Sequence, residues 1–327
     1  MRSTKDAIVV ITSPEDVTAN LVIASLNERG ACVARVDPAD VGSGLTFDAR
    51  LGGERASWSG RLRTTSRDIA LEEVRAVYYR RPSPWRFEAL EAQAREFAIT
   101  EARHGLHGLI ANLPNCRYVN HPANISRSDY KPAQLQLAAQ LGFAIPETLI
   151  ANDLEAAKEF AKEHDPIVYK SFRGIPHKID GKVATIWTQR VDSADLDESI
   201  AVTAHMFQAE VPKHSDARVT VVGSHVFASQ ITSPEGMLDW RSGDWDTLAH
   251  TPIRVPSSVV ARLHAYLDSF GLAFGCFDFA LEETEGGVEP YRWVFIECNP
   301  NGQWGWLPDA EAIADAFAHT LLEGYTV

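Results

Sequence analysis

The stretch that says most about the fold is residues 293–304, which read Trp-Val-Phe-Ile-Glu-Cys-Asn-Pro-Asn-Gly-Gln-Trp. The run up to residue 299 has the apolar character of a β-strand, in which side chains alternate between two faces, so Glu297 and Asn299 project from the same face. A carboxylate and an amide oxygen in this arrangement can both ligate a hard cation such as Mg²⁺, which prefers oxygen ligands. The stretch therefore predicts a strand that carries part of a metal site.

The preceding predicted strand, residues 275–281, supplies a second acidic group. Asp278 lies there between two phenylalanines. If the chain turns symmetrically about Gly286 and Gly287, Asp278 falls almost opposite Glu297, and two directly opposed carboxylates repel unless a cation lies between them. We therefore interpret the pair as metal ligands. The alternative is a buried Asp held by backbone donors and a Glu at a strand end.

Four basic residues elsewhere suit a ligand rich in phosphate. Lys170 ends a predicted strand beside a turn that contains Gly174, where glycine lets a backbone approach a phosphate closely. Lys131 falls in the first turn of a predicted helix, where a lone lysine is unfavourable unless an anion compensates it. Arg218 and Arg241 complete a set suited to a triphosphate and an anionic intermediate, although each taken singly is more often a solvated surface charge.

The composition favours a folded, acidic protein of more than one domain. The chain has 327 residues, and 31 Lys and Arg against 44 Asp and Glu give a formal net charge of −13. At about 100 to 200 residues per domain, this length predicts two domains or a two-domain core with a third lobe. The acidic total argues against nucleic acid as a partner, because neutralising a phosphate backbone takes a surplus of Lys and Arg. No apolar run approaches the roughly 20 residues of a membrane span and no hydrophobic signal segment opens the chain, so we expect no membrane partner and a cytoplasmic location.

The N-terminal region has the pattern of an α/β domain. A β-branched run over residues 7–11 precedes a helix that runs from an N-cap at Ser13 to residue 29, and residues 31–36 form the next predicted strand. The unit lacks the Gly-X-Gly-X-X-Gly turn of dinucleotide-binding folds. We therefore interpret Asp37 as a turn residue rather than a ribose ligand.

A loop of unusual composition separates a predicted strand over residues 74–79 from a predicted helix over residues 87–110. It reads Arg80-Arg81-Pro82-Ser83-Pro84-Trp85. Two prolines flanked by cations and an indole suggest a rigid, exposed recognition loop. A surface turn with its charges in water is the alternative, and both interpretations stay open.

The rest of the chain predicts a compact α+β section followed by a mostly β section. Ser128 or Asp129 is expected to cap a helix that runs through Leu141. Gly223 and Ser224 are expected to form a two-residue hairpin turn with glycine first. The other predicted elements are a hairpin over residues 45–65, a strand over 147–150, a helix over 153–163, a strand over 167–169, paired strands over 218–222 and 225–231, and a closing helix over 309–322.

These residues resemble the ATP-grasp ligases, and more closely the branch that matures ribosomal peptides into graspetides, the microviridin-type synthetases. The resemblance is strong from about residue 119 to 306 and weaker before it. The motifs that carry it are Asn120-His-Pro followed by Lys131, Tyr169-Lys170-Ser171, Phe207-Gln208-Ala-Glu-Val-Pro-Lys213, Ser215-Asp-Ala-Arg218, Asp239-Trp-Arg241 and Glu297-Cys-Asn-Pro-Asn-Gly-Gln-Trp304. The Asn-Pro-Asn-Gly-Gln-Trp extension and the Arg-Arg-Pro of the first domain point to the peptide-maturing branch.

The resemblance implies a chain of α/β and α+β class with the ATP-grasp fold and an N-terminal Rossmann-like pre-ATP-grasp domain. Residues 1–118 would form that N-terminal α/β domain, 119–206 the central ATP-grasp lobe and 207–327 the C-terminal ATP-grasp lobe. The nucleotide would lie between the two lobes. A homodimer is implied as well.

The implied activity is that of an ATP-grasp ligase that forms ADP and phosphate. An Asp or Glu side-chain carboxylate of a precursor peptide would be activated as an acyl phosphate. It would then be joined to a Ser or Thr hydroxyl or a Lys amine of the same peptide, giving an ω-ester or ω-amide macrocycle. The cofactors would be ATP and Mg²⁺, and the partner a precursor peptide with a leader and an acidic core.

The same resemblance implies roles for individual residues. Lys131, Lys170 and Arg218 would hold phosphates, and Arg241 would stabilise the acyl phosphate, so that Arg218 and Arg241 are the candidate catalytic cations. The magnesium ligands would be Asp278, Glu297 and Asn299. A linker would bind adenine through its main chain, with its side-chain roles open; its candidate residues are Gln208, Glu210, Val211 and Lys213.

Two further segments receive expected roles. Arg80, Arg81 and Trp85 are expected to contact the leader or the acidic core of the peptide, because an Asp/Glu-rich substrate needs cationic partners on an acidic protein. Residues 173–181 would form a mobile cover over ATP, with glycines that absorb the motion.

Two other functions remain as alternatives. The first is an ATP-grasp carboxylate-amine ligase that adds an amino acid to a small molecule or a protein tail. The second is a non-catalytic nucleotide-binding module, which the complete Asp278, Glu297 and Asn299 set disfavours.

Overall fold

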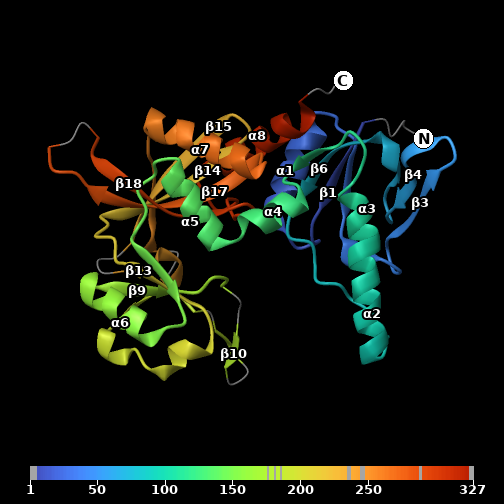
Figure 1. Ribbon diagram of the computed structural model, residues 1–327. Helices are drawn as coiled ribbons and strands as arrows, with labels where there is room; N and C mark the ends of the chain where they lie inside the picture. Colours follow the sequence, from blue (N-terminus) through green and yellow to red (C-terminus); the bar gives the residue numbers. More distant parts are fainter. Residues whose placement is uncertain are drawn as a thin grey trace.

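The computed structural model describes residues 6–174, 177–179, 182–184, 186–233, 237–243, 247–286 and 289–323. Figure 1 shows an N-terminal sheet and a five-stranded sheet side by side, with a smaller central sheet below the five-stranded one. Within these ranges, no helix combines the length and the apolar character that a membrane span needs. The predicted mixture of α/β and α+β architecture is confirmed.

The N-terminal part is an α/β unit on a parallel sheet of strand order β2-β1-β6-β7. Its main elements are β1 (Ala7–Ile11), α1 (Val17–Glu28), β2 (Val33–Val36), β6 (Val74–Tyr79) and β7 (Arg117–Val119). β1 is buried at every residue, as a central strand covered on both faces should be. A second antiparallel sheet holds β3 (Thr46–Gly52), β4 (Arg55–Arg63) and β5 (Asp68–Ala70), with the short η2 (Leu71–Glu73) after it. The predicted β-α-β unit and the hairpin are confirmed.

The first helix begins later than predicted. Asp16, not Ser13, is the N-cap, because an Asp16 carboxylate oxygen accepts a hydrogen bond from the backbone N–H of Ala19 at 3.0 Å. Asp37 is the turn residue that the sequence predicts, since its carboxylate accepts from Ala39 N and caps the short helix η1 (Pro38–Asp40).

The helix predicted over residues 87–110 is shorter and interrupted. It consists of α2 (Ala92–Ala102), the π-helical turn η3 (Arg103–His107) and α3 (Gly108–Ile110). Gly105 lies inside the irregular turn, where glycine lowers the preference for a regular α-helix.

The next predicted helix is in fact two helices, α4 (Pro122–Ser128) and α5 (Lys131–Gln140). Asp129 ends α4 instead of capping α5, and Ser128 Oγ donates to Ile125 O within α4. Proline at position 132 explains the break. Its ring is tolerated only in the first turn of a helix, so α5 begins at Lys131.

The central sheet is small and antiparallel, with strand order β12-β9-β13-β8. Its strands are β8 (Thr148–Ala151), β9 (Ile167–Lys170), β12 (Gln189–Val191) and β13 (His205–Ala209). It is accompanied by α6 (Leu154–Glu163) and the short helices η4 (Ser193–Asp195) and η5 (Glu198–Val202). The predicted cover contains part of the strand pair β10 (His177–Ile179) and β11 (Lys182–Ala184), and its residues 175, 176, 180 and 181 lie outside the described ranges.

The five-stranded antiparallel sheet has the order β16-β15-β14-β17-β18 and forms the base of the site. Its strands are β14 (Ser215–Val222), β15 (His225–Thr232), β16 (Ala249–Pro252), β17 (Phe274–Glu283) and β18 (Tyr291–Asn299). The helices α5 and α7 (Ser257–Phe270) contribute apolar side chains to its core, and the short η6 (Trp240–Ser242) follows β15. Gly223 has φ of +55° in the predicted two-residue turn between β14 and β15.

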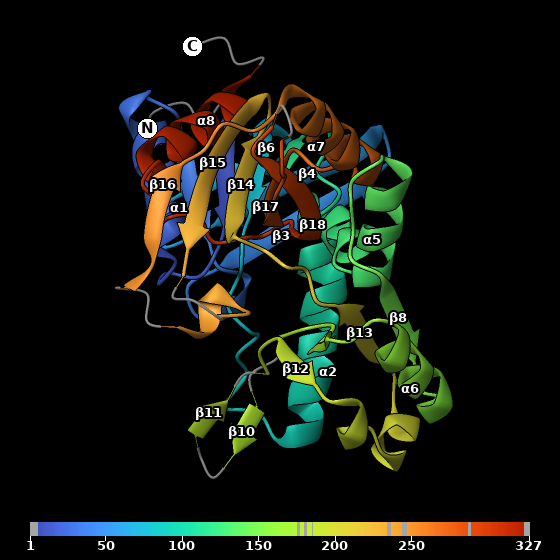
Figure 2. The ribbon, with the colours of Figure 1, turned by 90° about the vertical axis from the view of Figure 1, so that its left-hand side faces the viewer.

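The closing helix α8 (Ala310–Leu322) joins the five-stranded sheet to the N-terminal part. One apolar core contains side chains of β1, α1, β6, β17 and α8. Trp304 lies fully buried in this core and its ring stacks on Phe317 with centroids 5.2 Å apart. The segment that follows Asn299 is therefore held by the N-terminal part and by the five-stranded sheet. Figure 2 shows the central sheet as a separate layer below these two parts.

Candidate active site

The candidate site is a cavity of about 730 Å³ lined by side chains of all three parts of the molecule. Lys131 and Gln134 come from α5, Lys170 from the end of β9, and Glu297 and Asn299 from the end of β18. The cavity also has Arg81, Asp239, Arg241 and Asn301 in its lining. Residues that are far apart in the sequence thus share one cavity, as the sequence predicts for most of them.

The strand register places the candidate metal ligands on one face of the sheet. Asp278 of β17 is paired with Glu297 of β18, which confirms the predicted opposition, and Arg218 of β14 is the partner of Asp278 on the other side. Asn299 lies two residues beyond Glu297 and therefore faces the same way. The face thus holds two carboxylates, an amide and a guanidinium in adjacent positions.

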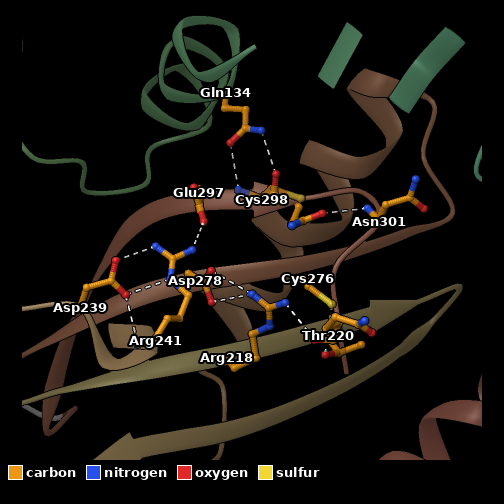
Figure 3. A network of polar contacts seen from close by, with 12 residues as sticks. Gln134, Arg218, Thr220, Asp239, Arg241, Cys276, Asp278, Glu297, Cys298 and Asn301 are labelled. Carbon is orange, nitrogen blue, oxygen red and sulfur yellow. Dashed lines mark hydrogen bonds and ion pairs between the residues drawn. The ribbon is translucent and has the colours of Figure 1, made fainter. Parts of the chain in front are cut away.

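Asp278 is neutralised by Arg218. One terminal nitrogen of Arg218 lies 2.8 Å from each carboxylate oxygen, and the other donates to Gln303 O at 3.0 Å (Figure 3). Both side chains are buried. Burial alone would lower the pKa of Arg218, but Asp278 reverses this and raises it. The guanidinium of Arg218 thus compensates the charge of Asp278.

Glu297 is surrounded by cations. Lys131 Nζ donates to one of its oxygens, and a terminal nitrogen of Arg241 donates to the other at 3.1 Å. Lys131 is the main reason that the pKa of Glu297 lies well below its usual range, so this carboxylate is ionised at neutral pH. Asp239 holds Arg241 in place through two further hydrogen bonds of 2.9 Å (Figure 3).

Lys170 differs from these cations because it has no partner among the described residues. Among the described residues it makes neither a hydrogen bond nor an ion pair, although it lines the cavity. Burial, and then the charge of Lys131, lowers the pKa of Lys170 to about 8. An anion bound in the cavity would stabilise the protonated form of Lys170 and so offset both effects on its pKa. Lys170 is therefore a strong candidate for binding phosphate.

The donor set fits a magnesium ion. No three His, Cys, Asp or Glu side chains of the described ranges cluster as a ready-made metal site. Mg²⁺ nevertheless needs only one or two protein carboxylates, because it keeps water and phosphate oxygens as its other ligands. Asp278 and Glu297 supply two carboxylates on one face, and Asn299 supplies an amide oxygen beside them.

A smaller cavity of about 70 Å³ adjoins the first and shares Lys170, Asp239, Arg241 and Glu297 with it. Apolar side chains that suit a flat ring line it; they are Pro146, Val168, Leu238, Ala280 and Ile296. The predicted adenine-binding residues line it as well; they are Gln208, Glu210, Val211 and Lys213. The predicted linker therefore lies beside a cavity with the character of a base-binding pocket.

The polar side chains of this linker are already engaged within the protein. Glu210 forms an ion pair with Arg190 at 2.5 Å, and Lys213 Nζ donates to Asp216 at 2.6 Å. The backbone N–H of Val211 has no hydrogen-bond partner among the described residues. This arrangement favours recognition of a base by the main chain, as the sequence suggests.

The loop that follows β6 departs from prediction in part. Arg80 is fully buried and is held by Asp16, Gly302 O and Gln303, so the predicted direct contact with a peptide is wrong for Arg80 in this structure. Trp85 packs on the N-terminal core. Arg81 alone among the three predicted residues lines the large cavity.

Gln134 is a site residue that no sequence signal singled out, and Asp239 appeared only within the motif Asp239-Trp-Arg241, without a role of its own. Gln134 donates to Cys298 O at 2.8 Å and accepts from Cys298 N at 3.0 Å, which fixes β18 between Glu297 and Asn299 (Figure 3). Asp239 orients Arg241. Helical spacing from Lys131 could have indicated Gln134, and adjacency to Arg241 could have indicated Asp239.

Comparison with known proteins places this site in context. Residues 7–126 match the family described as the MvdD pre-ATP grasp domain. A ligase from Chryseobacterium gregarium, described as a RiPP-associated ATP-grasp ligase in complex with ADP and a leader and core peptide, superposes with a TM-score of 0.88 at 25% identity, over 98% of each chain.

Two macrocyclases from Microcystis aeruginosa MRC are also similar. MdnC, solved with the precursor peptide MdnA, gives a TM-score of 0.83 at 28% identity, over 97% of this chain and 99% of that chain. MdnB gives 0.78 at 29% identity, over 97% and 99%. No curated protein sequence matches the chain.

Proposed function

We propose that the chain is an ATP-grasp ligase and that, like the similar enzymes that macrocyclise ribosomally made peptides, it is itself such a macrocyclase. It would activate Asp or Glu side chains of a precursor peptide with ATP and join them to Ser or Thr hydroxyls or Lys amines of the same peptide. The supporting observation is that Lys131, Lys170 and Arg241 converge on one cavity beside the paired carboxylates of Asp278 and Glu297.

The chemistry has two steps, and neither requires a nucleophile from the protein. A peptide carboxylate oxygen attacks the γ-phosphorus of ATP, the bond from that phosphorus to the bridging oxygen breaks, and ADP leaves with the electron pair. A hydroxyl or amine of the peptide then attacks the acyl carbon, and phosphate leaves with the electrons of its C–O bond while the nucleophile loses a proton to solvent or phosphate. Catalysis is therefore mainly positioning and charge neutralisation.

The residues of the cavity suit this task. Lys170 and Lys131 would hold phosphate oxygens, and Arg218 and Arg241 would stabilise the charge that develops during transfer. Asp278, Glu297 and Asn299 would hold magnesium, which, when bound, offsets phosphate charge. Arg218 contacts Asp278 and Arg241 contacts Glu297, so both cations lie beside the proposed metal ligands.

The base of the nucleotide would lie in the smaller cavity. The main chain around Val211 and the apolar lining would bind adenine, while Gln208, Glu210 and Lys213 shape the cavity. Residues 1–118 would act as the pre-ATP-grasp domain, and 119–206 and 207–327 as the two lobes.

The partner would be a precursor peptide with a leader and an acidic core. A protein with a net charge of −13 must bind such a core through a local basic site, and the large cavity concentrates cations. We further propose that the enzyme acts as a homodimer in the cytoplasm.

The metal assignment is tested by Glu297→Gln. Loss of the charged ligand should lower ATP- and peptide-dependent phosphate release by about 100-fold or more, because metal stabilisation of phosphoryl charge is worth several kcal/mol. Glu282→Gln is the matched control, since Glu282 lies on the same hairpin and pairs with Arg292. Phosphate release by Glu297→Gln at the rate of the unaltered protein would contradict the assignment.

The ligase class is tested by co-expression with each short acidic open reading frame beside the gene. A macrocyclase should lower the peptide mass by one water per link. The alternative, a ligase that adds an amino acid, should raise the mass by one residue. An unchanged mass for every such peptide would count against the macrocyclase.

A further inference from the structure

We infer that Arg81 binds the peptide carboxylate that is to be activated, and holds it at the end of the cavity away from the base. This inference rests on the proposed function. It names one residue of the N-terminal part as a determinant of which acidic side chain reaches the γ-phosphate.

The backbone at Arg81 is held in an uncommon conformation. Its φ is +42°, in the left-handed region that side chains other than glycine rarely adopt. The flanking chain fixes it, since Arg80 N donates to Ile11 O at 2.8 Å and Ser13 N donates to Arg81 O at 3.4 Å. A conformation of this kind persists only where the surroundings impose it, and such residues cluster at functional sites.

Arg80, the residue before Arg81, is held in place by its own contacts. The buried guanidinium of Arg80 lies 2.8 Å from Asp16 and donates to Gly302 O at 2.9 Å. Arg81 Nε donates to Asn301 O at 3.1 Å. The two arginines thus tie their loop to the segment that directly follows Asn299, so Arg81 and the candidate metal ligands are held in a fixed relation.

The remaining donors of Arg81, an exposed residue, have no protein partner among the described residues. Beyond the bond to Asn301, its guanidinium makes no hydrogen bond or ion pair with the described residues, although the side chain lines the large cavity. Desolvation by the surrounding protein, and then the charge of Arg80, lowers the pKa of Arg81. A carboxylate would accept one hydrogen bond from each terminal nitrogen of Arg81, in the bidentate geometry that guanidinium favours.

The order of residues along the two cavities identifies which anion Arg81 meets. Lys170, Arg241 and Glu297 line both cavities and so lie where the two cavities meet. Arg81 and Asn301 line the large cavity and not the smaller one proposed for the base. The attacking and leaving oxygens must be roughly in line through the γ-phosphorus, so the attacking carboxylate belongs beyond the phosphates, on the Arg81 side.

The test is a double-mutant cycle with the peptide that the unaltered protein converts in the mass assay. Arg81→Ala should weaken binding of this peptide to the protein loaded with Mg²⁺ and AMPPNP by about 10- to 100-fold, as expected for a lost hydrogen-bonded charge pair. Replacement of the reacting peptide Glu by Gln, or Asp by Asn, should weaken binding similarly. The two changes together should cost little more than either one, because both remove the same contact.

Three measurements separate this role from others. AMPPNP affinity should change by less than twofold in Arg81→Ala, and Arg81→Lys should restore part of the peptide affinity. Arg81→Asn tests the backbone, because asparagine tolerates the left-handed region and should leave the thermal midpoint unchanged. Arg86→Ala, in the same loop but outside the cavity lining, should bind the peptide normally.

Several results would overturn the inference. Loss of AMPPNP affinity with unchanged peptide affinity would make Arg81 a phosphate ligand. Additive effects in the cycle would show that Arg81 and the reacting carboxylate do not touch. If the unaltered protein converts no acidic peptide, the proposed function fails and this inference falls with it, whereas conversion with normal peptide binding by Arg81→Ala removes the inference alone.

Discussion

The two sheets that flank the cavity are built very differently. The five-stranded sheet packs against a large core with rings of Phe277, Phe279 and Phe295 at its centre. The central sheet has six buried residues in its own core cluster within the described ranges, two of them alanines of α6. The well-packed sheet carries the ion-paired residues Arg218, Asp278 and Glu297, and the lightly packed one carries Lys170, which has no partner among the described residues. One wall of the cavity thus carries charges that are paired within the protein, and another wall carries Lys170.

The largest expected effect comes from disrupting the buried ion pair of the five-stranded sheet. Asp278→Ala leaves the buried Arg218 without its counter-ion, and breaking a buried pair in this way costs about 3–5 kcal/mol of unfolding free energy. Chemical denaturation measures this loss. A double variant, Arg218→Met with Asp278→Leu, should recover much of the stability and none of the activity. Unchanged stability in the single variant would contradict the buried pair.

A change on the other wall should remain local. Phe207 is the largest side chain of the central core, and Phe207→Ala should cost about 3 kcal/mol within that lobe. Hydrogen exchange should accelerate in β8, β9, β12 and β13 and stay the same in β14, β17 and β18. Acceleration of equal size in all seven strands would mean that the two walls unfold together and that the contrast is wrong.

The smallest expected effect is the pH dependence of nucleotide binding that Lys170 causes. Lys170 loses its proton as pH rises through about 8 in the free protein, whereas bound phosphate favours the charged form. AMPPNP affinity should therefore be constant below about pH 8 and fall by up to about tenfold per pH unit above it. Calorimetric titration measures this. Lys170→Met should bind more weakly and show no such decline, and an unchanged decline in that variant would assign the proton to another group.

Much of the fold follows from local signals. The β1-α1-β2 unit, the turn at Gly223 and the opposition of Asp278 and Glu297 were all predictable, because strand periodicity and turn chemistry act over a few residues. Helix boundaries were less so. Asp16 rather than the predicted Ser13 caps α1, and Asp129 ends α4 instead of capping α5, because the surrounding chain selects among residues of similar capping ability.

The candidate site shows the same division. Lys131, Lys170 and Glu297 could be identified because a charged residue at the end of a predicted strand or in the first turn of a predicted helix is informative by itself. Gln134 could not, because its role is to bond the backbone of Cys298, which is distant in the sequence. The predicted roles of the adenine linker and of the domain boundaries remain predictions.

Arg80 and Arg81 give the clearest case of what each level of structure determines. Local sequence is enough to predict that a cationic, proline-stiffened loop follows a buried strand, and it leads to the expectation that cations of this acidic protein surround one anionic ligand. The burial of Arg80 against Asp16, while Arg81 lines the cavity, could be seen only in the folded chain. The reason is physical: adjacent side chains of one type differ only through the backbone conformation and the partners that surround them. Those partners, Asp16 and residues 301–303, come from the two ends of the chain.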